Sequence, residues 1–152
     1  MRKTDQIPHH LYIFGSLFIL ANRVDTLMER ALSKYGVSTK QWFLSICVAS
    51  LFDKDPSLKD LAKVSGSSHQ NIKQVALKLE QKDLMNLYKD PKDARVTRVR
   101  LSESSPAFWA QSDGDAQTFL SDLYRDIDEK DLKVVREVFE KLEQNLLSME
   151  EK

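Results

Sequence analysis

The stretch at residues 57–101 constrains the fold of this chain more than any other part of the sequence. It predicts four elements, two helices followed by two strands, at residues 57–64, 68–82, 85–89 and 96–101. The helices are separated by a three-residue turn that contains Gly66, which is typical of a helix-turn-helix. The predicted hairpin behind them adds a wing. We therefore expect a winged helix-turn-helix.

The second predicted helix of this motif has one apolar face and one polar face. Its apolar residues recur every three or four positions and fix the helical register: Ile72, Val75, Ala76 and Leu79. The opposite face and the first turn then carry His69, Gln70, Asn71, Lys73, Gln74 and Lys78. Gln and Asn pair with adenine, and Lys pairs with guanine, in the major groove of DNA. Ser68 and the free N–H groups at the helix start suit a phosphate. We expect this face to bind double-stranded DNA; the plainer alternative is a solvated helix face.

The connection between the two predicted strands carries turn residues and three basic side chains, those of Lys89, Lys92 and Arg95. An arginine at the tip of a wing can enter the narrow, negatively charged minor groove. Asp93 can hold that guanidinium in position through a charge-assisted hydrogen bond. The wing therefore adds Lys92, Asp93 and Arg95 to the candidate DNA-binding residues.

The distribution of charge supports this interpretation, although the formal net charge of the chain is zero. Residues 57–101 contain ten basic and five acidic side chains. Residues 102–152 contain six basic and thirteen acidic side chains. Such asymmetry predicts a basic working face, with the acidic remainder facing water or other protein.

A further helix is predicted between the first helix and the motif. Gly36 is expected to end the first helix, and Ser38 with Gln41 forms a capping box that starts the next, which runs to about Phe52. Its predicted inward face comprises Trp42, Phe43, Ile46, Cys47, Ala49 and Ser50. A cysteine in such a set usually behaves as a small hydrophobe, and a redox-sensing thiol is the alternative.

Long helices are predicted on both sides of the motif. Residues 8–33 carry two overlapping apolar stripes, a wider face than one neighbouring layer requires, so we expect this helix to pack on its own domain and on a second subunit. A central helix in a monomeric bundle is the alternative. Beyond the wing, Ser105 and Pro106 predict the start of a helix that runs to about Asp126, weakened at Gly114.

A last helix is predicted to begin at Asp128. Its apolar residues form a seam at three- and four-residue steps: Leu132, Val135, Phe139, Leu142, Leu146 and Met149. This seam is long enough to pack on a partner helix. A two-fold dimer would also allow two half-sites about 10 base pairs apart to be recognised.

Other functional classes find little support. The histidines lack metal-ligand spacing, and the sequence contains no glycine-rich phosphate loop or serine elbow, so we expect no enzymatic activity, no metal and no cofactor. No uninterrupted apolar run approaches the roughly 20 residues of a membrane helix. The start MRKTDQIPHH lacks the apolar core of a signal peptide, and a single cysteine suits a reducing compartment. We expect a cytoplasmic protein that does not bind membranes.

Two segments, LKDLAKVSGSSHQNIKQVALKLEQKDLM and DPKDARVTRVRLSE, resemble the MarR family of winged-helix transcription regulators. The resemblance implies a mainly α fold with a small β wing, in which long N- and C-terminal helices interleave across a dimer. It assigns residues 38–101 to the DNA-binding lobe and residues 8–34 and 104–150 to the dimerisation helices of a single domain spanning residues 1–152. The sequence departs from the family where Asp83 replaces a usual glycine.

By the same resemblance, Gln70, Asn71, Lys73 and Gln74 would face the major groove, Arg95 would enter the minor groove and His69 would touch a phosphate. The family also implies a homodimeric repressor that binds an inverted-repeat operator and is relieved by a small aromatic ligand. Two alternatives remain at this stage. One is a winged helix that binds protein and not DNA, and the other is a regulator of the same fold that senses oxidation through Cys47.

Overall fold

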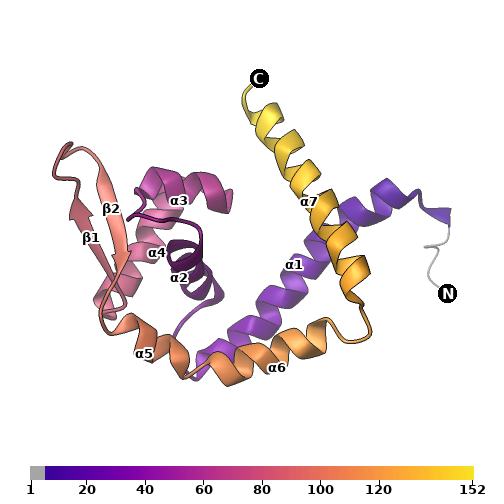
Figure 1. Ribbon diagram of the computed structural model, residues 1–152, viewed down its shortest axis with the longest axis horizontal. Helices are drawn as coiled ribbons and strands as arrows, with labels where there is room; N and C mark the ends of the chain where they lie inside the picture. Colours follow the sequence, from indigo (N-terminus) through magenta and orange to yellow (C-terminus); the bar gives the residue numbers. More distant parts are fainter. Residues whose placement is uncertain (1–5) are drawn as a thin grey trace. The chain divides into compact units, whose positions relative to one another are not determined.

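The computed structural model describes residues 6–152 of a mainly helical chain (Figure 1). Its elements are α1 (His9–Ser33), α2 (Thr39–Ser50), α3 (Leu58–Ser65), α4 (His69–Gln81), β1 (Met85–Lys89), β2 (Thr97–Leu101), α5 (Ser105–Ala110), α6 (Asp113–Leu123) and α7 (Glu129–Glu150). They form two compact units, Met1–Asp113 and Gly114–Lys152. The predicted fold class, α with a small β wing, is confirmed. The sequence prediction that the first ten residues lack a signal peptide rests partly on residues 1–5, which lie outside the residues that the structure describes.

Within the described part of the first unit, helix α1 joins the core through its C-terminal end. Leu32 is buried in the core, and Met28 and Tyr35 pack against that core. Most apolar side chains nearer the N-terminus are exposed. Within residues 6–152, α1 is also the one helix long and apolar enough to cross a membrane by length and composition. The sequence prediction concerned only uninterrupted apolar runs of membrane-spanning length. It does not cover α1, because Arg23 and Asp25 interrupt the apolar sequence of this helix.

Helix α2 begins as predicted but buries a different face. The Ser38 hydroxyl accepts from the Gln41 N–H at 3.2 Å, and the Gln41 side chain accepts in return from the Ser38 N–H. The buried residues are Gln41, Leu44, Ser45, Cys47 and Val48. The predicted inward face was wrong except at Cys47 and the half-buried Trp42: the others, Phe43, Ile46, Ala49 and Ser50, are exposed. Apolar residues surround most of this helix, so the large aromatic side chains gave no reliable register.

The helix-turn-helix forms with the predicted caps and turn. Ser57 and Asp60 make a reciprocal capping box at the start of α3, and Gly66 adopts the left-handed conformation (φ 61°) that ends it. Ser68 caps α4 by accepting from the Asn71 N–H at 3.1 Å. The predicted buried residues Ile72, Ala76 and Leu79 lie in the core, and Val75 is partly buried. These caps set where the exposed first turn of α4 begins.

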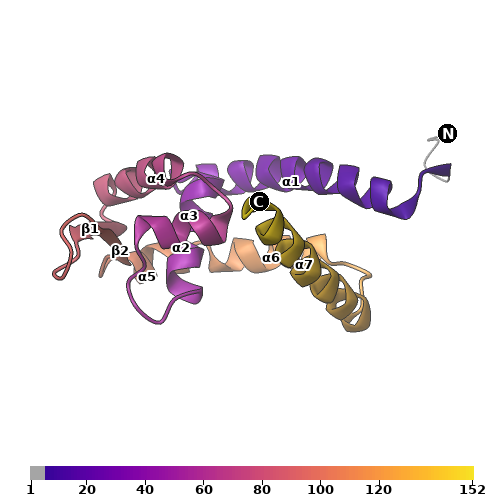
Figure 2. The ribbon, with the colours of Figure 1, turned by 90° about the horizontal axis from the view of Figure 1, so that it is seen from above.

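The wing is an antiparallel hairpin in which Met85 pairs with Leu101 and Lys89 with Thr97. It is fixed to α4 by a tight connection in which Asp83 takes a positive φ of 57°. Met85 and Val99 are fully buried against the helices. Figure 2 shows the hairpin beside α4 at the same end of the lobe. Asp83 thus adopts the left-handed conformation at the position where the family that the sequence resembles usually has glycine.

Beyond the wing, the single helix predicted from Ser105 to Asp126 was wrong. The chain forms α5 and then α6, interrupted before Gly114. Ser105 does not cap α5: its side chain is buried, and Ser104 occupies the cap position. In the second unit, Asp128 caps α7 as predicted, by accepting from the Asp131 N–H at 2.8 Å. The seam residues of α7 are exposed except Leu132, which is partly buried.

The α3 capping box makes the stability of the lobe depend on pH. Hydrogen bonds from the Ser57 hydroxyl, and then from the Ser57 N–H, lower the pKa of Asp60. A carboxyl group whose pKa is lower in the folded state stabilises the fold above its unfolded pKa of about 3.9, and this contribution is lost as pH falls through the folded pKa. Asp60→Asn should therefore flatten the acid limb of the free energy of unfolding, measured by urea denaturation between about pH 5 and pH 2.

Ser57→Ala should flatten the same limb, since it removes the donor, and should cost about 1 kcal/mol at neutral pH. An unchanged acid limb in both variants would contradict this origin of the pH dependence. Asp90 and Asp93, whose pKa values are also lowered, should preserve part of the limb.

Candidate nucleic-acid interface

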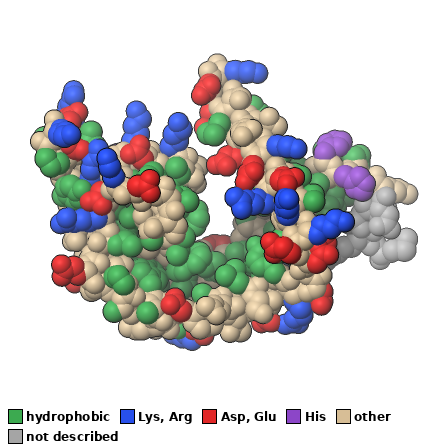
Figure 3. All heavy atoms as spheres, viewed as in Figure 1, with side chains coloured by type: hydrophobic (Ala, Val, Ile, Leu, Met, Phe, Trp, Pro, Cys, Tyr) green, Lys and Arg blue, Asp and Glu red, His purple; other side chains and the backbone are tan. Residues whose placement is uncertain are grey.

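The polar face of α4 is exposed along its length. All side chains that the sequence assigned to this face are accessible: Ser68, His69, Gln70, Asn71, Lys73, Gln74 and Lys78. They lie opposite Ile72, Ala76 and Leu79, which hold the helix on the core. The structure thus brings the predicted donors and acceptors onto one surface whose backbone is rigidly supported. Figure 3 shows Lys and Arg side chains gathered over the hairpin and the helices beside it.

The wing tip presents Arg95 in a two-bonded ion pair with Asp93. The Arg95 guanidinium donates two hydrogen bonds to the Asp93 carboxylate, from Nε to Oδ1 and from Nη2 to Oδ2, both at 3.0 Å. The Arg95 N–H also donates to Asp93 Oδ1 at 3.1 Å. The Arg95 side chain is nevertheless 91% exposed. This geometry matches the predicted pairing of Asp93 with Arg95. Asp93 binds one edge of the guanidinium, and the rest of the group is open to solvent. Lys92 is exposed beside it.

The far end of α4 is fastened to the turn between α1 and α2, a contact that sequence patterns did not indicate. The Lys82 ammonium donates to the Gly36 carbonyl and, at 2.9 Å, to Gln41 Oε1. Gln41 is buried, and this bond together with its capping bond satisfies its side-chain oxygen. Lys82 is one of the ten basic residues counted in residues 57–101, but its ammonium group forms hydrogen bonds within the lobe. The separation of 41 residues from Gln41 left no local signal for this pairing.

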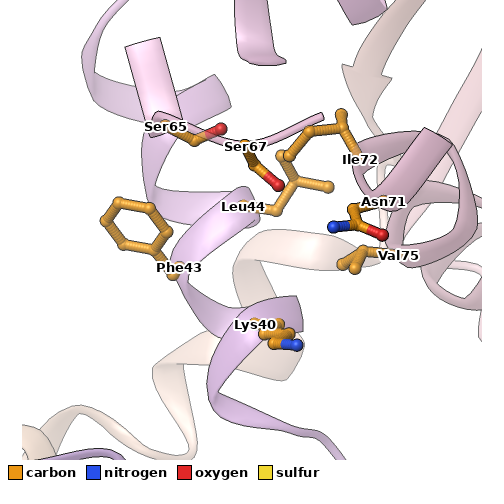
Figure 4. A pocket seen from close by; sticks show the side chains of 8 residues that line it. All are labelled: Lys40, Phe43, Leu44, Ser65, Ser67, Asn71, Ile72 and Val75. Atoms are coloured by element: carbon orange, nitrogen blue, oxygen red, sulfur yellow. The ribbon is translucent and has the colours of Figure 1, made fainter. Parts of the chain in front are cut away.

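A small, mostly apolar pocket of about 210 Å³ lies between α2 and α4 (Figure 4). Its lining residues are Lys40, Phe43, Leu44, Ser65, Ser67, Asn71, Ile72 and Val75. In Figure 4 the α4 side chains face Phe43 and Leu44 of α2 across this space. Asn71 therefore belongs both to the exposed first turn of α4 and to the pocket wall. Phe43 is the aromatic residue in this lining.

Cys47 lies in the core and away from this surface. It is 2% exposed, and burial raises the pKa of its thiol above the ordinary value. The thiolate is the reactive form, so both effects disfavour oxidation. Treating the native protein with millimolar hydrogen peroxide should leave Cys47 unmodified by mass spectrometry and the DNA affinity unchanged. A sulfenic acid that formed at Cys47 with loss of DNA binding would instead support the thiol-sensing alternative. Unfolded protein provides the positive control for reactivity.

Among residues 6–152, no group of three or more His, Cys, Asp or Glu side chains is placed to hold a metal ion. The predicted site residues form two exposed parts, the α4 face and the wing tip. Hydrogen-bond donors and acceptors dominate the first part and a cation dominates the second. Such a surface is suited to binding a polyanion with readable edges.

No family model matches the sequence. Solved structures share its fold: a MarR/EmrR family transcriptional regulator from Acinetobacter is 17% identical with a TM-score of 0.80, over 93% of this chain and 99% of that one. A MarR protein from Peptoclostridium difficile is 13% identical with a TM-score of 0.79, over 96% and 92%. The MepR–DNA complex of Staphylococcus aureus contains a chain that is 17% identical with a TM-score of 0.74, over 92% and 99%. The chain therefore has the fold of MarR-family regulators.

Proposed function

We propose that this chain is a MarR-type transcription regulator that binds double-stranded DNA in a sequence-specific manner. In this proposal it is a cytoplasmic homodimer that represses transcription by binding an inverted-repeat operator, and a small ligand relieves it. The α4 side chains Gln70, Asn71, Lys73 and Gln74 contact the major groove, His69 and Ser68 contact phosphate, and the wing with Lys92 and Arg95 reaches the adjacent minor groove.

The observation that carries the proposal is the pairing of the exposed polar face of α4 with a wing whose Arg95 is held by Asp93. A helix face of hydrogen-bonding side chains with an oriented cation on the wing is the arrangement that recognition of two DNA grooves requires. The fold adds support, since a chain of the same fold has been solved in a complex with DNA.

Selection of bound duplexes from a random-sequence pool tests the proposal. Purified full-length protein should enrich an inverted repeat whose half-sites lie about one helical turn apart at near-physiological salt. Binding without enrichment that weakens steeply as salt rises would mean that only phosphates are held. No binding in the absence or presence of candidate ligands would favour the protein-interaction alternative.

The dimer is supported by the apolar surface of α1. Phe14 and Phe18 contact each other edge to face at 5.3 Å between ring centroids, yet are 62% and 60% exposed. Burying each would contribute about 1.5–3 kcal/mol, which favours either a second protein surface or a lipid phase. Sedimentation in detergent-free buffer should give twice the monomer mass. A detergent-dependent monomer that partitions into vesicles would instead assign α1 to a membrane.

The pocket between α2 and α4 supports the ligand part of the proposal. A ligand acts on DNA binding only if it favours one arrangement of the lobe over another. A small aromatic molecule against Phe43 would touch Asn71 directly, and so would compete with the position that Asn71 needs at the DNA. Titrating small aromatic acids into the complex with the selected duplex should release DNA. Loss of that release in Phe43→Ala, with DNA affinity retained, would assign the ligand to this pocket.

A further inference from the structure

The base of the wing contains a network of polar contacts that extends from the body of the lobe to the wing tip. It joins Asp55, which precedes α3, to Tyr88 on β1, Arg98 on β2 and Asp90 at the start of the wing loop. None of these residues belongs to the predicted DNA-binding set. Their side chains are only partly exposed, with 10% for Asp90 and 34% for Arg98. They therefore face the lobe and each other more than solvent.

The inner half of the network fixes the hairpin to the helix-turn-helix. The Tyr88 hydroxyl donates to Asp55 Oδ2 at 2.5 Å, and Arg98 Nη1 donates to the Asp55 carbonyl at 2.8 Å. The backbone adds a bond from the Val99 N–H to the Pro56 carbonyl at 3.0 Å. Both strands are thus attached to the segment that leads into α3. The hairpin cannot tilt relative to α3 without breaking several of these bonds.

The outer half of the network shapes the loop. One Asp90 oxygen accepts from the Arg98 guanidinium, and the other accepts from the N–H groups of Lys92 and Asp93 at 2.7 and 3.2 Å. Asp93 in turn holds the Arg95 guanidinium. Hydrogen bonds from Arg98, followed by that from the Lys92 N–H, lower the pKa of Asp90, so it is ionised at neutral pH. An unbroken series of contacts thus links Asp55 to the exposed Arg95.

We propose that Asp90 is a positioning residue for DNA recognition, which sets the place and direction of Arg95 through the wing loop, and that Arg98 neutralises Asp90 and does not contact DNA. This inference rests on the proposed DNA-binding function. The inference predicts a change in DNA affinity on removal of Asp90 that is opposite to the change expected from charge alone. An acidic side chain near DNA repels phosphate, so removing it should strengthen binding at every sequence. If Asp90 positions Arg95, its removal should weaken binding to the operator in spite of the gained positive charge.

The test compares Asp90→Ala with Asp53→Asn in the full-length protein. Asp53 is exposed, lies two residues before Asp55, and has no hydrogen bond or ion pair among the described residues, so its replacement makes the same change in net charge without touching the network. The affinities of both variants are measured for the selected duplex and for a random duplex across a series of salt concentrations. Thermal unfolding establishes that both variants are folded.

Asp90→Ala should reduce the ratio of operator affinity to random-duplex affinity by about tenfold or more, the loss expected for one specific groove contact. The slope of log affinity against log salt should fall by about one, because Arg95 no longer reaches its site. Asp90→Asn keeps an acceptor for the loop N–H groups and should lose less. Asp53→Asn should leave the ratio and the slope unchanged. Equal or stronger operator binding by Asp90→Ala would overturn the proposal.

A second measurement needs no DNA. Backbone ¹⁵N relaxation should show Lys92, Asp93 and Arg95 as ordered as the strands in the native protein and mobile on the picosecond-to-nanosecond timescale in Asp90→Ala. A loop that stays ordered in this variant would also overturn the proposal. If the native protein selects no DNA sequence while the loop behaves as expected, the proposed function fails and the role of Asp90 in recognition fails with it. The geometric account of the loop would stand alone in that case.

Discussion

Replacing Leu79 with alanine should lower the free energy of unfolding by about 2–5 kcal/mol, the range expected for truncating a large, fully buried side chain. Leu79 is 0% exposed and belongs to the cluster that joins the helices to the wing. Its carbonyl also accepts from the Leu84 N–H at 2.9 Å where the chain turns into β1. Truncation would leave a cavity beneath α4 that its neighbours can fill only in part. Urea denaturation followed by circular dichroism measures the loss.

Leu77 supplies the matched control, because it lies on the same helix two residues away but is 39% exposed. Leu77→Ala makes the same chemical change and should cost clearly less than Leu79→Ala, since 39% of Leu77 is already exposed and its truncation leaves no enclosed cavity. Equal losses in the two variants would mean that α4 does not pack on the core through the face described here. The register of all the candidate DNA-binding residues would then be in error.

The second large effect is expected on DNA affinity. The double variant Lys73→Ala/Arg95→Ala removes one cation from the α4 face and one from the wing, and should weaken binding to the selected duplex by about 100-fold or more. Each side chain is expected to reach a different groove, so the two losses should be close to additive. The salt dependence should also become shallower by about two. Fluorescence anisotropy with a labelled duplex measures both quantities.

A variant with the same loss of charge elsewhere separates recognition from general electrostatics. Lys130 and Arg136 are exposed on α7, in the acidic second unit, and Lys130→Ala/Arg136→Ala should bind DNA almost as the native protein does. Unchanged affinity in Lys73→Ala/Arg95→Ala would argue that the winged helix binds protein and not DNA. Similar losses in both double variants would mean that the total charge, and not the proposed face, governs binding.

Features with a local physical cause were predictable from the sequence. The capping boxes at Ser38 and Ser57 depend on residues three positions apart, and both formed. The same is true of the Ser68 cap and of the Asp93–Arg95 pair. The α4 register followed from one clear apolar stripe, so the exposed candidate residues were placed on the expected face. Whether these residues bind DNA stays a prediction.

Features that depend on distant contacts were not predictable in this way. Arg98 counted as one of ten basic residues in the motif, but its partners Asp55 and Asp90 lie 43 and 8 positions away, and nothing in the local pattern selects them. Helix α2 was assigned the wrong inward face because its buried residues include the polar Gln41 and Ser45. The break between α5 and α6 was marked only by Gly114, which a continuous helix can tolerate.

The bond from Lys82 to Gly36 and Gln41 has a mechanical consequence. The Lys82 side chain joins the C-terminal end of α4 to the turn between α1 and α2, so a movement of α1 about this turn would also displace α4. In the proposed dimer, the angle at which the two α1 helices cross would then set the distance between the two α4 helices. In that dimer, a change at the subunit interface would alter the spacing of the two α4 helices without any rearrangement inside α4 itself.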